Sequence, residues 1–301
     1  MKKALVAVLA GSMVFSLAAC GSSTSETAAT TEAAAETTTE AADETATTEA
    51  AEEATTEEEA DTEAVDLSES KYLSDGVLTV GLNATFPPFE YVGDDQNPTG
   101  FDVAMMNEIG SRLGVEVVIE DMDFDGIVAA IGTKIDCAAT GMTITEERQE
   151  AVNFSDPYYN ATQAVLLPAD STIATADDLA AASAIGVQAG TTGETVAREI
   201  NDAAVVSVKS FNQAVLDLVN GKDEAVVIDQ VPGEAFVAQY SDQLKLVDGS
   251  EFDFDVEQYG IAMPKDDEVM LNAINNALAE MKEDGTYDAL VEEYINNYEA
   301  E

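Results

Sequence analysis

The 301-residue chain contains no histidine. This absence excludes Ser–His and Cys–His nucleophilic pairs, and it excludes metal sites built on imidazole ligands. Cysteine occurs only as Cys20 and Cys137, which is too few for a disulfide framework. Any catalysis would have to rely on carboxylates, lysine or tyrosine, and we expect neither a metal ion nor another cofactor.

Basic residues are also scarce. The chain has 12 Lys and Arg against 60 Asp and Glu, which gives a formal net charge of −48 at pH 7. Nucleic acid and anionic lipid surfaces repel such a polyanion, so neither is an expected partner. The sequence contains no Walker motif, so any ATP hydrolysis linked to its function would take place on another protein.

The first apolar run is too short to cross a membrane. It follows Met1-Lys2-Lys3 and has about 16 residues, whereas a span needs about 20. Residues 1–20 therefore fit a signal peptide. The run ends in LAACG, which resembles the lipobox of bacterial lipoproteins. Cys20 is thus predicted to carry a lipid that anchors the chain to the outer face of the cytoplasmic membrane, which is the cell surface in a Gram-positive organism.

Residues 21–70 consist mainly of Thr, Ala and Glu and show no apolar periodicity. Such a segment cannot bury a core, and we predict a disordered linker. A flexible chain of about 50 residues has a reach of roughly 40 Å. A domain on this linker could meet a membrane partner without being held against it.

From residue 72 onward, strand-like and helix-like segments alternate. The expected strands lie at 77–82, 115–119, 135–139, 184–187, 204–208 and 225–229. The expected helices lie at 101–114, 124–131, 146–151, 192–200 and 211–221. This alternation predicts an α/β fold with sheets rich in parallel strands.

The two halves of this region repeat one pattern. AAIGTKIDCAATG and DLVNGKDEAVVID each contain helix, glycine turn, lysine and strand. Aligning Lys134 with Lys222 places Gly141 opposite Asp229, each just beyond the carboxyl end of a strand. Ligands bind at this edge of open α/β sheets. Two lobes that face each other are therefore predicted to form a cleft.

Seven segments carry a resemblance to a known family: NATFPPFEY, TGFDVAMMNEI, DFDGIVAAI, TGMTITEER, VNFSDPYY, VQAGTTGE and EDGTYDALVEEY. In order and spacing they resemble the bacterial family 3 extracellular solute-binding proteins, the polar amino acid receptors of ABC importers. The resemblance covers roughly residues 75–298. It implies a two-lobed, periplasmic-binding-protein-like (type II) fold with two Rossmann-like lobes. Lobe 1 would comprise residues 72–160 and 258–301, and lobe 2 residues 161–257, joined by two hinge strands.

The resemblance and the chemistry of an amino acid together indicate a site. A carboxylate and an ammonium both need partners when they are buried. Arg148 is expected to hold the carboxylate, helped by N–H groups near Thr143 and in the loop before the helix at 192–200. Asp229 is expected to hold the ammonium, assisted by the Gly141 carbonyl or the Thr143 hydroxyl.

The side chain of the ligand would contact aromatic rings at Phe86 and Phe124. Asn83 stands where the family often has Asp, and Gln188 supplies a neutral amide. Both residues favour a polar or neutral amino acid. The complete set of expected ligand-binding residues is Asn83, Phe86, Phe124, Thr140, Gly141, Thr143, Arg148, Gln188, Thr191, Thr192 and Asp229.

Each of these residues also has an ordinary structural interpretation. Arg148 could pair with Glu146 and Glu147 on a helix surface, and Asp229 could cap a strand end. Phe86 and Phe124 could belong to the core, and Thr143 and Thr192 could cap helices. Cys137 lies between apolar residues and is expected to be an inert core thiol.

The function expected from these patterns is a monomeric substrate-binding lipoprotein that delivers an amino acid to an ABC permease and its separate ATPase. One alternative is a cyclohexadienyl-dehydratase-like enzyme on the same fold, which would need a general acid in the cleft. Another is a sensor component that presents the liganded lobes to a receptor.

Overall fold

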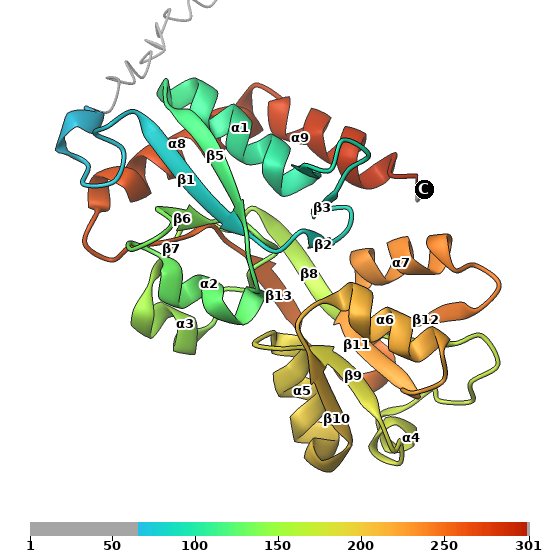
Figure 1. Cartoon of the computed structure of the whole chain (residues 1–301). Helices are drawn as coiled ribbons and strands as arrows, with labels where there is room; N and C mark the ends of the chain where they lie inside the picture. The colour runs from blue at the N-terminus through green and yellow to red at the C-terminus, as the bar shows by residue number, and fades with distance from the viewer. Residues whose placement is uncertain (1–65, 300–301) are drawn as a thin grey trace, which may run out of the picture. The chain divides into compact units, whose positions relative to one another are not determined.

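The computed structural model describes residues 66–299. The predicted signal peptide, Cys20 and most of the predicted linker lie outside the described residues. In the part that is described, strands form a five-stranded and a six-stranded sheet, each flanked by helices (Figure 1). We call the portion around the five-stranded sheet lobe 1 and the portion around the six-stranded sheet lobe 2.

The sheet of lobe 1 is built around β1 (Val77–Leu82), four of whose six residues are buried. β1 pairs in parallel with β5 (Glu116–Asp121) and β6 (Cys137–Ala138). Two strands from later in the chain complete the sheet in the order β5-β1-β6-β14-β7, and both join it by antiparallel pairing. They are β14 (Ala262–Met263) and β7 (Asn153–Phe154). The C-terminal part of the chain thus returns to lobe 1.

The helices of lobe 1 cover both faces of this sheet (Figure 1). Helix α1 buries Phe101, Met105 and Ile109 on one face and is followed by the cap Gly114, whose φ of 69° is in the left-handed region that glycine adopts readily. A small sheet of three short strands follows β1. The helices are α1 (Phe101–Leu113), α2 (Phe124–Ala130), α3 (Glu146–Ala151), α8 (Glu268–Glu283), α9 (Thr286–Leu290) and the π-helical η4 (Val291–Asn296), and the short strands are β2 (Thr85–Phe86), β3 (Glu90–Val92) and β4 (Pro98–Thr99).

Lobe 2 has strand order β10-β9-β11-β8-β12. Strands β9, β10 and β11 are parallel, whereas β8 and β12 are antiparallel to their neighbours. In lobe 2, the parallel pairing predicted from strand–helix alternation therefore holds for β10, β9 and β11, at one end of the sheet. The elements are β8 (Tyr159–Pro168), α4 (Ala176–Ala180), β9 (Ile185–Gln188), α5 (Thr192–Asn201), η2 (Asp202–Ala204), β10 (Val205–Val208), α6 (Phe211–Val219), β11 (Ala225–Asp229), α7 (Gln230–Gln239), β12 (Leu244–Asp248) and η3 (Gly249–Phe252).

Two strands connect the lobes. β13 (Val256–Tyr259) pairs antiparallel with the first part of β8, so that Glu257 lies opposite Ala161. The loop after β6 is attached to β13 by backbone bonds: the Ile144 N–H donates to the Gln258 carbonyl at 2.8 Å. The hinge strands and the loop that carries Thr143 therefore form one connected unit.

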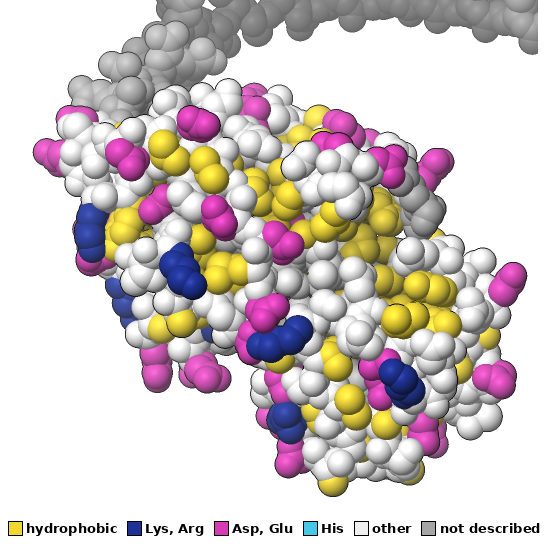
Figure 2. Space-filling model, in the orientation of Figure 1, with side chains coloured by type: hydrophobic (Ala, Val, Ile, Leu, Met, Phe, Trp, Pro, Cys, Tyr) yellow, Lys and Arg dark blue, Asp and Glu magenta, His cyan; other side chains and the backbone are white. Residues whose placement is uncertain are grey.

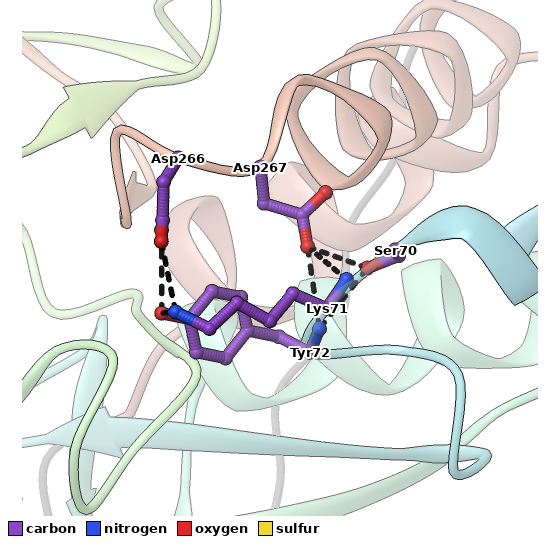
Figure 3. A network of polar contacts seen from close by, with 5 residues as sticks. All are labelled: Ser70, Lys71, Tyr72, Asp266 and Asp267. Carbon is purple, nitrogen blue, oxygen red and sulfur yellow. Dashed lines mark hydrogen bonds and ion pairs between the residues drawn. The ribbon is translucent and has the colours of Figure 1, made fainter.

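The described chain begins with a short 3-10 turn, η1 (Leu67–Glu69), followed by the buried residue Ser70. Asp267 at the start of α8 anchors this turn, because its Oδ2 accepts from the Ser70 hydroxyl at 2.7 Å and from the Lys71 N–H at 2.8 Å (Figure 3). The expected end of the linker at residue 70 lies inside this ordered turn. Its anchor is 196 residues away from Lys71 in the sequence, so linker composition alone could not reveal it.

Apolar side chains from both lobes fill the interior. Cys137 is fully buried and free, as expected for a core thiol, and burial raises the pKa of its thiol. Acidic side chains are spread over the face shown in Figure 2, with few basic ones among them. No helix between residues 66 and 299 combines the length and the apolar character that a membrane span requires.

Candidate functional site

The cavity between the lobes is lined by every residue that the sequence indicated for ligand binding. Glu90 and Phe211 line it as well. Its volume is about 20 Å³, close to the space that one water molecule needs. An amino acid could therefore enter only if the lobes or the lining side chains move apart. The full lining is Asn83, Phe86, Glu90, Phe124, Thr140, Gly141, Thr143, Arg148, Gln188, Thr191, Thr192, Phe211 and Asp229.

Arg148 is held in this cavity by backbone carbonyls. It lies in the first turn of α3, and its guanidinium donates to the Thr143 carbonyl at 2.7 Å and to the Gly190 carbonyl at 2.9 Å. The guanidinium carbon is 5.4 Å from the centroid of the Phe124 ring. Among residues 66–299 it forms no ion pair. The alternative of a helix-surface pair with a neighbouring glutamate is therefore not what the structure shows.

A guanidinium has five N–H groups in a planar fork. Two of those of Arg148 are used by the Thr143 and Gly190 carbonyls, and the remaining ones can hold an anion. Burial lowers the pKa of the Arg148 guanidinium, while the negative charges of Glu257 and Asp229 raise it. Arginine stays protonated under such opposing shifts. The cavity thus contains a permanent positive charge.

Asp229 supplies a buried carboxyl group at the end of β11. It is 7% exposed, and its Oδ1 accepts from the Tyr259 hydroxyl at 2.7 Å. It is the last residue of β11 and precedes α7, to which its side chain makes no capping bond. Burial, followed by the charge of Glu257, raises the pKa of Asp229 to about 7. A nearby cation would stabilise the ionised form of this group.

Thr143 and Thr192 of the cavity do not cap helices. The cap of α3 is Thr145 and the cap of α5 is Thr191, each accepting a backbone N–H with its side chain. The Thr143 and Thr192 hydroxyls donate instead to Glu257, at 2.6 Å and 2.8 Å. The capping alternative for these two residues is thus wrong.

Two amides meet across the lobes. Gln188 at the end of β9 donates to the Asn83 side-chain oxygen at 2.7 Å. The same nitrogen of Gln188 donates to the Lys209 carbonyl at 3.0 Å, and the Asn83 amide donates to the Met122 carbonyl at 2.8 Å. The acceptor oxygen of Gln188 can therefore turn toward a ligand.

Gly141 shapes the aromatic part of the cavity. Its φ is 50°, and a Cβ there would lie 2.6 Å from the Phe86 ring. The Phe86 ring in turn stacks on Phe211 with centroids 5.3 Å apart. Because residue 141 lacks a side chain, the Phe86 ring can come close to the backbone. Phe124 faces the same cavity from the start of α2.

Comparison with known proteins decides the family. The bacterial extracellular solute-binding proteins, family 3, match residues 78–297 of the chain. The chain belongs to this family. The L-cystine-binding protein TcyJ of Escherichia coli strain K12 is 34% identical over 226 residues, which cover 73% of this chain and 83% of TcyJ.

Solved structures agree with this family 3 assignment. A mutant of ArgBP from T. maritima is 42% identical with a TM-score of 0.70, covering 78% of this chain and 100% of that chain. An ancestral arginine-binding protein bound to glutamine is 40% identical with a TM-score of 0.69, covering 73% and 97%. The expected two-lobed type II fold is confirmed by these structures.

In this family 3 protein, the sequence patterns missed three residues of the site. Phe211 follows the cap Ser210 at the start of α6, and Glu257 lies on the hinge strand. Glu90 is 1% exposed and accepts from the Thr140 hydroxyl at 2.6 Å. Burial and the neighbouring Asp102 raise the pKa of Glu90 well above its ordinary value. Glu90 lies within the segment NATFPPFEY, so the family resemblance could have indicated it.

Proposed function

We propose that the protein captures one amino acid between its lobes and delivers it to an ABC permease driven by a separate ATPase. The observation that carries the proposal is the pair of opposite charges in one cavity: among residues 66–299, neither Arg148 nor Asp229 forms an ion pair. These two groups complement the carboxylate and the ammonium of an α-amino acid. The family supports it, as do relatives named an L-cystine-binding protein and a probable histidine-binding protein.

We further propose that the ligand side chain is polar or neutral. The Asn83–Gln188 pair presents amides rather than carboxylates at the cavity, and Phe86 and Phe124 offer apolar ring surfaces. The raised pKa of Glu90 favours its uncharged form, which keeps this part of the cavity neutral. One solved relative, an ancestral arginine-binding protein, also holds the neutral amino acid glutamine.

The decisive experiment is thermal unfolding of the soluble chain from residue 21, screened against the twenty amino acids, cystine and ornithine. A ligand that binds only the folded state stabilises it by about 2.7 kcal/mol at a hundredfold excess over Kd. We expect one or a few polar, uncharged amino acids to raise the midpoint. A response to none would contradict the proposal, and a response confined to arginine, lysine and ornithine would contradict the neutral side chain.

We also propose that Cys20 carries the lipid anchor, with the folded lobes outside the cytoplasmic membrane. The LAACG motif and the acidic Thr/Ala/Glu-rich linker support this arrangement. Palmitate labelling of cells that express the full chain tests it. The label is expected in the wild-type chain and absent from Cys20→Ala, which should be released from the membrane fraction.

The dehydratase alternative receives some support from one group. A carboxyl with a pKa of about 7 could act as a general acid, and Asp229 is such a carboxyl. We nevertheless propose binding without turnover, because Asp229 lies where an ammonium would need a counter-charge. Incubation with a cyclohexadienyl carboxylic acid, followed by product analysis, decides between the two. Formation of an aromatic product would establish the enzyme.

A further inference from the structure

Glu257 connects the two lobes through hydroxyl groups. It lies on the hinge strand β13, and its Oε2 accepts from Thr143 of lobe 1 at 2.6 Å and from Thr192 of lobe 2 at 2.8 Å. Gln163 on the other hinge strand donates to the same oxygen at 3.4 Å. Within the described part of the chain, Glu257 forms no ion pair. Its charge is therefore balanced only by dipoles and by the more distant Arg148.

Glu257 does not line the cavity itself, whereas Thr143 and Thr192 do. A threonine hydroxyl has one proton and two lone pairs. When that proton is donated to Glu257, only lone pairs remain for other neighbours. Both hydroxyl oxygens are thus left as acceptors, and that of Thr192 uses one lone pair for the Gln163 amide at 3.3 Å.

Acceptors at this place suit an ammonium group. Asp229 lies opposite Gln163 in the pairing of β11 with β8, and the Gln163 amide donates to Glu257 at 3.4 Å and to the Thr192 hydroxyl at 3.3 Å. The oriented hydroxyls and Asp229 therefore belong to the same end of the cavity. An ammonium has three protons to donate. Asp229 and the two hydroxyls can accept them.

We propose that Glu257 is a positioning residue for the ammonium end of the ligand. It orients the Thr143 and Thr192 hydroxyls as acceptors, and it does so from the hinge, where one oxygen contacts both lobes at once. This inference rests on the proposed function, because it presupposes a ligand with an ammonium group. A side chain at 257 that can also donate would leave the hydroxyls free to turn and would weaken binding.

The test is a double-mutant cycle on the soluble chain from residue 21. Glu257→Gln keeps the shape but adds an N–H donor, and Thr143→Val keeps the shape but removes the hydroxyl. The twenty amino acids, cystine and ornithine are the probes, and affinity for the strongest binder is then measured by calorimetry. We expect each single substitution to weaken binding by about 10-fold, the size of one hydrogen bond in affinity. The double variant should lose little more than either single one, because both changes remove the same contact.

Gln258→Ala is the matched control. Its side chain lies on the same strand but bonds to the exposed Asn160, and its affinity should equal that of the wild type. A wild type that responds to no amino acid would overturn the proposed function and this inference together. A wild type that responds, with Glu257→Gln unchanged or with effects that multiply to about 100-fold, would overturn this inference alone. Thermal unfolding midpoints measured without ligand identify any variant that fails to fold.

Discussion

Two arginines of lobe 1 have opposite surroundings. On the outer face, Arg112 reaches three carboxylates, with distances of 2.8 Å to Glu108, 3.7 Å to Glu280 and 2.7 Å to Asp284. In the cavity, Arg148 bonds to two carbonyl oxygens and, within the described part of the chain, to no carboxylate. Carboxylates outnumber basic groups 60 to 12 in this chain, so the lack of a partner at Arg148 is not due to scarcity. The comparison indicates that the fold places no carboxylate of the described residues in an ion pair with Arg148, so that the charge of Arg148 is available to a ligand.

The largest effect that this comparison predicts comes from Arg148→Ala. A ligand carboxylate would then be buried without a cation, which costs affinity by roughly 1,000-fold. Calorimetric titration with the amino acid found in the screen measures the loss. Arg112→Ala removes the same side chain outside the cavity and should bind like the wild type. Equal affinity in both variants would show that the two arginines do not differ in function.

Asp229→Asn is expected to weaken binding by about 100-fold, because a charged hydrogen bond to the ammonium is lost. It should also stabilise the ligand-free protein at high pH. The folded pKa of Asp229 is about 7, above its ordinary 3.8. Its favourable contribution is therefore complete below pH 4 and is lost as the pH rises through 7, by at most on the order of 4 kcal/mol.

Urea unfolding at pH 5 and pH 8 measures this second effect. From pH 5 to pH 8, the free energy of unfolding of the wild type should fall relative to that of the variant, because Asn does not titrate. A difference in stability that is the same at both pH values would mean that Asp229 is not the buried acid described here. Arg112 pairs with Glu108, Glu280 and Asp284 and not with Asp229, so Arg112→Ala should change stability by the same amount at both pH values.

Ligand affinity should itself depend on pH. An ammonium binds Asp229 in its ionised form, so below pH 7 the ligand must displace a proton. We expect Kd to rise by up to about tenfold per pH unit below that value. The Asp229→Asn variant should show a much flatter profile. A flat profile in the wild type would contradict the assignment of Asp229 to the ammonium.

Much of this site could be predicted from the sequence because its residues follow strand ends. Asp229 and Gln188 stand at the ends of β11 and β9, and Gly141 follows β6, where α/β sheets bind ligands. The hydrogen-bond partner of the Thr143 and Thr192 hydroxyls could not be predicted. Thr143 and Glu257 are 114 positions apart, and helix patterns alone suggested caps for Thr143 and Thr192. The antiparallel direction of β8 and β12 could not be predicted from a local sequence pattern either, because the direction of pairing depends on where the chain crosses between the lobes.

Two glycines allow a second comparison between the cavity and the outer surface of lobe 1. Gly141 and Gly114 both have positive φ, but only at Gly141 would a Cβ meet another group, the Phe86 ring at 2.6 Å. Alanine at either position should cost about 1 kcal/mol of stability from backbone strain. Only Gly141→Ala should also displace Phe86, and we expect it to weaken binding by roughly 10-fold. Thermal unfolding and titration of the two variants measure both effects, and equal affinities would show that the Phe86 position is unimportant.

The smallest expected effect is that of Arg112→Ala on stability. Its partners Glu280 and Asp284 are about half exposed, and ion pairs in such positions contribute little. The unfolding midpoint should fall by less than about 3 °C, and the fall should shrink at high salt because solvent ions screen the pairs. Scanning the variant at low and high ionic strength measures this. A large, salt-independent fall would mean that Arg112 stabilises the packing between α1 and α8 rather than a surface network of ion pairs. Arg112 and Arg148 would then differ in packing as well as in their charged partners.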